Sequence, residues 1–341
     1  MYSLKYDPDI CYSCTSVDCL TKCWYQDLND LQKAREEKNK ILRGESSEVL
    51  ENCRTCYGCE EHCPNNNHPF YQIVELQEKL GIKNVPDPIF KQQLRMMGPK
   101  NRIKKESLSS PIIDMCLFPQ LIDNIKGKLY EDVSIIWGGD IFCNIMWLHF
   151  ANMSVILERL PKMIQNIYEY YIKDSNTDEI ICFHDECYAA FKHLAPAYGI
   201  EVPFRPVHLF EYILNKLDQL KSDIKPLNVK IAYQRPCSNR LCPEMDEVLD
   251  KIFHRIGATR VKRKYDKDTP LCCGSVIRIQ QKDKEADELQ KENIMDMKGT
   301  GAKFTVFNCP MCMMTLGEEV ASEGLSPIHV SDLVRHALGE I

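Results

Sequence analysis

The chain of 341 residues is long enough for two domains, since a typical domain has about 150 residues. With 44% hydrophobic and 27% charged residues it can bury a large core, which excludes a disordered or fibrous chain. The formal net charge of −6 argues against a surface that binds nucleic acid or an anionic membrane.

Cysteine is the outlier of the composition. The 18 cysteines occur in a chain that is far too long for a small disulfide scaffold. The first residues, MYSLKYDPDI, lack the basic start and apolar run of a secretory signal. The uncharged stretch 141–157 is too short and too polar to span a membrane, so we expect no membrane span. The composition therefore predicts a cytoplasmic protein that uses its thiols to bind metal.

Residues 1–97 are expected to be helical, with almost no strand pattern. Asp27 is positioned to cap a helix whose apolar residues, among them Leu28 and Leu31, follow a helical period. A second helical period runs over residues 70–76. The basic, Ser/Pro-containing stretch 98–111 has no apolar period, and we interpret residues 98–130 as a linker.

Residues 131–341 change to short apolar runs that alternate with longer helical periods. The runs VSIIWGG, EIICF, VKIAY and KFTVF begin at residues 133, 179, 229 and 303. Short apolar runs followed by helical periods are typical of βα units, so we expect an α/β domain with parallel strands.

An internal repeat runs through this second region. When residues 180–191 are laid over residues 305–316, His184 falls on Cys309 and Cys187 falls on Cys312. Further on, His208 matches His329, and both begin a helical period as expected caps or core residues. The repeat predicts two α/β halves that arose by duplication.

Two cysteine motifs lie before residue 64: Cys11-x2-Cys14-x4-Cys19-x3-Cys23 and Cys53-x2-Cys56-x2-Cys59-x3-Cys63-Pro64. The second motif matches the bacterial ferredoxin run, in which the fourth cysteine binds the other cluster. One [4Fe–4S] cluster would then use Cys11, Cys14, Cys19 and Cys63, and the other Cys53, Cys56, Cys59 and Cys23. Four thiolates also suit zinc, but two crossed quartets with a following proline favour iron–sulfur clusters. This half resembles the α-helical ferredoxin domain of anaerobic reductases and succinate-dehydrogenase-type subunits.

A third constellation is spread over the second region: Cys237, Cys272, Cys273, Gly274, Cys309, Pro310 and Cys312. Adjacent cysteines are poor ligands of one small ion but can hold neighbouring irons of a larger cluster, and Gly274 lets the backbone approach it. The pattern resembles the cysteine-rich CCG domain of heterodisulfide reductase catalytic subunits. Together with the ferredoxin-like N-terminal half, nearly the whole chain resembles a heterodisulfide reductase of the D type, in which these two domains are fused. The resemblance implies that the five cysteines are catalytic and hold a noncubane [4Fe–4S] cluster, or a related larger one, that cleaves a disulfide.

The first repeat departs from the family pattern, because it has no second Cys-Cys pair. Cys143 is matched to the leading cysteine of the motif. Cys143, Cys182, His184 and Cys187 form either a smaller iron or zinc site or, the favoured interpretation, a lapsed site with buried thiols. Cys116 and Cys242 are expected to be packing residues.

The absence of a glycine-rich nucleotide motif from the sequence implies that electrons come from a partner, a flavin or ferredoxin-type donor in a redox complex. We expect an iron–sulfur oxidoreductase subunit that passes single electrons through two [4Fe–4S] clusters to the CCG cluster, which reduces a small thiol/disulfide substrate. The alternative is a non-catalytic electron-transfer or cluster-bearing subunit of a larger anaerobic complex.

Overall fold

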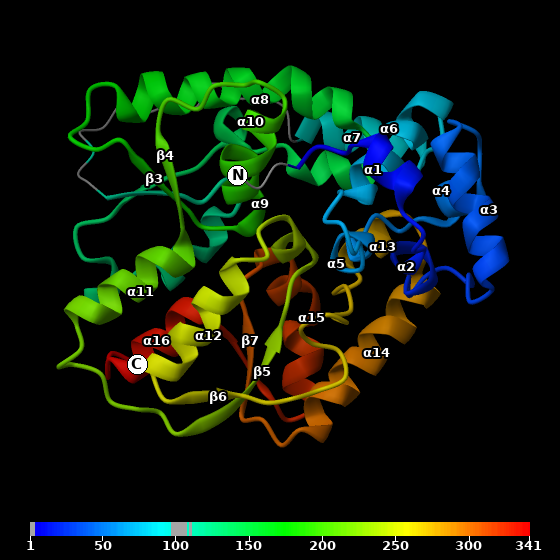
Figure 1. The fold of residues 1–341 in the computed structure, drawn as a ribbon. Helices are drawn as coiled ribbons and strands as arrows, with labels where there is room; N and C mark the ends of the chain where they lie inside the picture. The colour runs from blue at the N-terminus through cyan, green and yellow to red at the C-terminus, as the bar shows by residue number, and fades with distance from the viewer. Residues whose placement is uncertain (1–3, 97–107, 109–110) are drawn as a thin grey trace.

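The structure is a computed structural model that describes residues 4–96, 108 and 111–341. A helical N-terminal region packs against two α/β halves, each built on one four-stranded sheet (Figure 1). In the described part of the chain, no helix is both long and apolar enough to cross a membrane.

The N-terminal region contains helices and loops, with no strand among residues 4–96, as expected. Its helices are α1 (Pro8–Ser13), α2 (Asp18–Thr21), α3 (Leu31–Leu42), α4 (Glu48–Asn52), α5 (Gly58–Glu61), α6 (Pro69–Leu80) and α7 (Asp87–Met96). The predicted cap of α3 is wrong by three residues. Asp30 caps the helix, because its carboxylate accepts from the backbone N–H of Gln32 at 2.8 Å. Asp27 instead accepts from the side chain of Asn29.

The two sheets have the same topology. The first has the order β2-β1-β3-β4 and the second β6-β5-β7-β8, and each pairing within them is parallel. The strands are β1 (Ile112–Asp114), β2 (Ser134–Ile136), β3 (Glu179–Cys182), β4 (Arg205–His208), β5 (Val229–Gln234), β6 (Ala258–Arg260), β7 (Phe304–Phe307) and β8 (Ser326–His329). A strand lies at each of the four predicted apolar runs. The two sheets also share one strand order, as expected if the halves arose by duplication.

Helices cover the sheets and connect their strands (Figure 1). In the first half these are η1 (Pro119–Asn124), η2 (Lys128–Tyr130), η3 (Gly139–Ile141), η4 (Ile145–Phe150), α8 (Met153–Ile167), η5 (Tyr168–Ile172), α9 (Asp185–Ala189), η6 (Ala190–Leu194), α10 (Ala195–Ala197) and α11 (Leu209–Gln219). In the second half they are η7 (Cys237–Leu241), α12 (Met245–Arg255), α13 (Ser275–Ile279), α14 (Asp283–Gly299), α15 (Pro310–Ser322) and α16 (Val330–Ala337).

The predicted linker 98–130 extends too far toward the C-terminus. Strand β1 lies inside it and is an inner strand of the first sheet, paired with both β2 and β3. Ile112 and Ile113 are fully buried. The basic, Ser/Pro-containing stretch 98–111 runs up to this strand, which is why the sequence analysis placed it in the linker. Residues 97–107 and 109–110 of the predicted linker lie outside the described residues.

The two histidines matched by the repeat are helix caps, as predicted. The Nδ1 atom of His208 accepts from the N–H of Phe210 at the start of α11, and His329 accepts from Ser331 at the start of α16. Both imidazoles are fully buried. The same cap at the same place in each half supports the duplication.

The N-terminal region and the α/β halves share one hydrophobic core. Tyr57 and Phe70 of the N-terminal region belong to the same buried cluster as Ile112 of the first sheet and Ile231 of the second. Helix α5 also contacts η7 of the second half. The regions are therefore not independently packed modules.

Replacement of Phe70 by Ala tests this shared core. Phe70 is 1% exposed and its ring lies 4.4 Å from that of Tyr57. We expect the free energy of unfolding to fall by about 3–5 kcal/mol, because a large cavity remains in the core. Anaerobic thermal unfolding, followed by circular dichroism and by cluster absorbance, should show both signals shifting together.

The matched control is Leu31→Ala, because Leu31 is 55% exposed on α3. Its effect should stay within about 0.5 kcal/mol. Two separate transitions, of which only one moves in Phe70→Ala, would contradict a shared core.

Candidate metal centres

The eight N-terminal cysteines gather in the two predicted quartets. Cys11, Cys14, Cys19 and Cys63 line one pocket. Cys23, Cys53, Cys56 and Cys59 line another, to which Cys19 also contributes. The structure thus places each fourth cysteine, Cys63 and Cys23, with the three cysteines of the other motif.

The backbone directs N–H groups at the sulfur atoms of these quartets. The N–H of Thr55 donates to Cys53 Sγ, and the N–H of Asn67 donates to Cys63 Sγ, both at 3.3 Å. Thr55 has a φ of 52°, in the left-handed region that residues with a side chain seldom adopt. Such N–H donors stabilise negative charge on sulfur and tune a bound cluster.

Two of the quartet thiols, Cys19 and Cys23, are held in their neutral form in the absence of a cation. Burial, followed by the charges of neighbouring cysteines, raises the pKa of Cys19 to about 12 and that of Cys23 to about 12. Thiolate is the form that binds metal, so metal binding at these quartets must release protons. The residues present therefore fit an iron–sulfur cluster at each quartet.

The five cysteines of the third constellation come together in the second half. Cys237 begins η7 after β5, Cys272 and Cys273 precede α13, and Cys309 and Cys312 lie at the start of α15. Their thiols interact in a chain from Cys237 through Cys272, Cys273 and Cys312 to Cys309. Cys237 is half-buried and the other four are buried. The carboxyl ends of parallel strands thus carry the group, as is usual for sites in α/β sheets.

Gly274 permits the turn that follows the adjacent cysteines. Its φ is 86°, and a Cβ atom there would lie 2.7 Å from Nε2 of Gln290. That nitrogen donates to the carbonyl oxygen of Cys273 at 2.8 Å. Glycine is required at this position by the left-handed backbone and by the close approach of Gln290.

His184 of the first half reaches the five-cysteine group of the second. The pKa of Cys309 is lowered to about 5, first by a hydrogen bond from the Cys312 thiol and then by the charge of His184. Burial by itself lowers the pKa of His184, but the Cys309 thiolate outweighs this effect and raises that pKa to about 10. His184 and Cys309, the residues that the repeat aligns, thus influence each other's charge across the two halves.

The first half contains a different cysteine group from the predicted one. Cys116, Cys143 and Cys187 have their Sγ atoms within 4.8 Å of one another. Cys182 is outside this group, with its Sγ directed at the carbonyl oxygen of Ile180. Of the predicted set, Cys143 and Cys187 therefore meet, while His184 belongs to the neighbouring group.

Two sequence interpretations of single cysteines are corrected. Cys116 was expected to be a packing residue, but it lies two residues after β1, as Cys237 lies shortly after β5. Cys116, and not Cys143, therefore corresponds to the leading cysteine. Cys143 follows β2 as Cys272 follows β6. Cys242, also expected to pack, is fully buried in the hydrophobic core, which confirms that prediction.

The second quartet lies beside the five-cysteine group. Arg240 donates from Nη1 to the carbonyl oxygen of Cys56 and from Nη2 to that of Pro270, each at 3.1 Å. Loss of solvent, followed by the charges of Cys272 and Cys56, raises the pKa of Tyr25 well above its usual value. The charges of Cys56 and Cys272, one from each group, thus both act on Tyr25.

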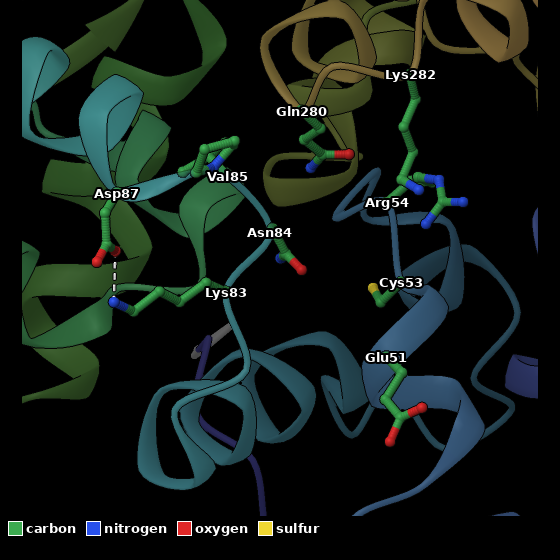
Figure 2. A pocket seen from close by; sticks show the side chains of 10 residues that line it. Glu51, Cys53, Arg54, Lys83, Asn84, Val85, Asp87, Gln280 and Lys282 are labelled. Carbon is green, nitrogen blue, oxygen red and sulfur yellow. Dashed lines mark hydrogen bonds and ion pairs between the residues drawn. The ribbon is translucent and has the colours of Figure 1, made fainter.

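A pocket of about 600 Å³ opens beside the second quartet (Figure 2). Cys53 lies on one side of it and Gln280 on another, with Arg54 and Lys282 between them. Gln280 donates from Nε2 to the hydroxyl oxygen of Thr55 at 3.2 Å. The pocket gives solvent access to the side of the second quartet rather than to the five-cysteine group.

Sequence reasoning missed two side chains near the cysteine groups, the buried His149 and the half-buried Glu186. Nδ1 of His149 donates to the carbonyl oxygen of Thr55 at 2.6 Å, and its Nε2 lies 3.8 Å from Glu186. Burial raises the pKa of Glu186 to about 7. Glu186 lies between His184 and Cys187 in the aligned repeat, which is the signal that could have singled it out. Nothing in the local sequence places His149 near the cysteines.

Comparison with known proteins identifies the second half. A family model described as a cysteine-rich domain, CCG, matches residues 231–317, which include all five cysteines of this group. A search among curated proteins gave no match. The chain contains a CCG cysteine-rich domain, and its cysteine groups indicate an iron–sulfur redox role.

Proposed function

We propose that the chain is an iron–sulfur oxidoreductase subunit that passes single electrons through two [4Fe–4S] clusters to a CCG-bound cluster. The observation that carries this proposal is that Arg240 bonds both to the carbonyl oxygen of Cys56 in the second quartet and to that of Pro270, two residues before Cys272. The order of transfer is then from the first quartet to the second and on to the five-cysteine group. A flavin or ferredoxin-type partner supplies the electrons.

Each group has enough thiols for the cluster assigned to it. The first quartet holds one cubane, the second quartet holds the other, and the five cysteines hold a noncubane or related larger cluster. When bound, such clusters supply one-electron redox chemistry. All 18 cysteines are free, which suits a reducing compartment such as the cytoplasm.

The proposed reaction is the reduction of a small disulfide to two thiols, as in heterodisulfide reductases. This reaction consumes two electrons and two protons. The cationic His184 beside Cys309 stabilises negative charge at the five-cysteine group. Glu186, which lies 3.8 Å from His184, is placed to hold a proton near the same group. These two residues position charge and protons, while the cluster provides the redox chemistry.

A second function is favoured by the burial of the five-cysteine group. Cys272, Cys273, Cys309 and Cys312 are each no more than 6% exposed. A relay subunit, which passes electrons to a partner without binding a substrate, needs no access to these sulfur atoms. Disulfide turnover by the isolated chain distinguishes the two functions.

Replacement of Cys56 by Ser tests the second quartet. We expect the iron content to fall by roughly four atoms per chain, since one cubane loses a ligand. The electron paramagnetic resonance (EPR) signal of the five-cysteine cluster should persist, because Cys56 is not among its ligands. Anaerobic iron analysis and EPR measure both.

Cys182→Ser is the matched control, because Cys182 is buried but lies outside these groups. Unchanged iron content in Cys56→Ser, or zinc in place of iron, would contradict the cluster assignment.

Replacement of Cys273 by Ala separates the catalytic function from the relay function. The cubane EPR signals should persist, because both quartets use other residues. Disulfide reduction with dithionite as the electron donor should fall to background, and a thiol added to the oxidised variant should no longer perturb a paramagnetic signal. Steady-state assays and EPR with and without a thiol measure these effects.

If the wild type neither turns over a disulfide nor changes its spectrum when a thiol is added, the catalytic proposal fails and the chain is a relay. Cys182→Ala serves as the control for loss of a buried thiol.

A further inference from the structure

Side chains of both α/β halves hold the loop that carries the second quartet. Thr55 lies between Cys53 and Cys56 and is fully buried. Its φ of 52° is in the left-handed region, a rare conformation for a residue that is branched at Cβ. Such a conformation persists only where the surrounding structure enforces it, and it is common at functional sites. The other regions of the chain supply the contacts that enforce it here.

His149 of the first half bonds to Thr55 at two points. Its Nδ1 donates to the carbonyl oxygen of Thr55 at 2.6 Å, and its own carbonyl oxygen accepts from the Thr55 hydroxyl at 3.0 Å. His149 is 4% exposed, and its ring lies 4.8 Å from that of Tyr57, two residues after Thr55. The two bonds fix the carbonyl group and the side chain of Thr55 at the same time.

Gln280 of the second half bonds to the same hydroxyl group. Its Nε2 donates to Oγ1 of Thr55 at 3.2 Å and to the carbonyl oxygen of His149 at 3.4 Å. Gln280 is the C-terminal cap of α13, the short helix that begins directly after the adjacent cysteines and Gly274. It lies at the edge of the pocket beside Cys53 (Figure 2). The N-terminal region and the two halves thus each supply one side chain to this junction.

With its carbonyl and hydroxyl groups held by the other regions, Thr55 directs its N–H at Cys53. This N–H donates to Cys53 Sγ at 3.3 Å. N–H groups directed at ligand sulfur stabilise the more negative, reduced state of a cluster and so raise its reduction potential. We propose that His149 and Gln280 are positioning residues, which hold Thr55 in this orientation and thereby raise the reduction potential of the cluster at the second quartet.

The first quartet has a comparable donor that is held locally. The N–H of Asn67 donates to Cys63 Sγ at 3.3 Å, and the Asn67 side chain bonds twice to the backbone of Asp7, at 2.7 and 3.0 Å. All these residues belong to the N-terminal region, so His149 and Gln280 act selectively on the second quartet. A raised potential there favours electron transfer from the first quartet to the second. The inference rests on the proposed function, because it needs a cluster at the second quartet.

The experiment measures the midpoint potential of each cubane in the full-length chain by EPR-monitored titration with dithionite. Cys56→Ser identifies the signal of the second quartet as the one that this variant lacks. In His149→Ala we expect that potential to fall below the wild-type value, while the potential of the first quartet stays unchanged. His149→Asn is the matched control. Its amide nitrogen can replace the Nδ1 donor, so the potential should return toward the wild-type value.

Two further variants cover the case in which His149→Ala does not fold. Thr55→Val removes the hydroxyl group at nearly constant volume, and Gln280→Leu removes the amide donor at the edge of the pocket. Both should lower the same potential, because each releases one hold on Thr55. Thr55→Ser, which keeps the hydroxyl group, should leave the potential near the wild-type value.

The outcomes distinguish this inference from the proposed function. If the wild type has no signal that Cys56→Ser removes, the proposed function fails and the inference fails with it. If the signal is present but its potential is the same in all three variants, or if His149→Asn and His149→Ala shift it equally, the inference alone is overturned. An equal shift of both cubanes also overturns it, because the substitutions would then act on the whole chain.

Discussion

The carboxylate of Asp185 is the buried group on which the arrangement of the two α/β halves depends. It accepts hydrogen bonds from His208 at 2.9 Å, Ser238 at 3.1 Å and Asn308 at 3.4 Å. Burial opposes its ionisation, but His208 and the other donors lower its pKa. Ser238 follows Cys237 and Asn308 precedes Cys309, so one charge from the first half fixes two ligand loops of the second. Loss of a donor would leave buried charge without compensation, which is strongly destabilising.

Buried arginines join the N-terminal region to the second half. Arg235 pairs with Glu61 at 2.9 Å, and Arg54 pairs with Glu285 at 2.8 Å. Arg240 bonds to the backbone of Cys56 and of Pro270, shortly before the adjacent cysteines. Because guanidinium groups present several donors in a fixed plane, these contacts set both distance and orientation. The contacts and the shared core hold the second quartet beside the five-cysteine group, as the proposed electron transfer requires.

The two halves show how one fold carries two different groups of cysteines. Both carry ligand positions after the first two strands of the half and at the start of the helix that follows the third. In the second half an adjacent pair and the thiolate of Cys309 enlarge the set to five sulfurs. In the first half, Cys309 is replaced by His184, whose imidazole turns toward the other group. The number and spacing of thiols, rather than the sheet, therefore decide what each half can bind.

The sequence by itself determined the cysteine quartets, the helical character of residues 4–96 and four of the strands, because these depend on local spacing and periodicity. It also aligned His184 with Cys309. It did not reveal β1, which directly follows the basic stretch 98–111, or the grouping of Cys116 with Cys143 and Cys187. Those three residues are far apart in the chain, and only the parallel pairing of β1 with β2 and β3 brings their loops to one edge of the sheet. The shared core and the arginine contacts likewise join residues up to 231 positions apart, a distance over which no local pattern carries information.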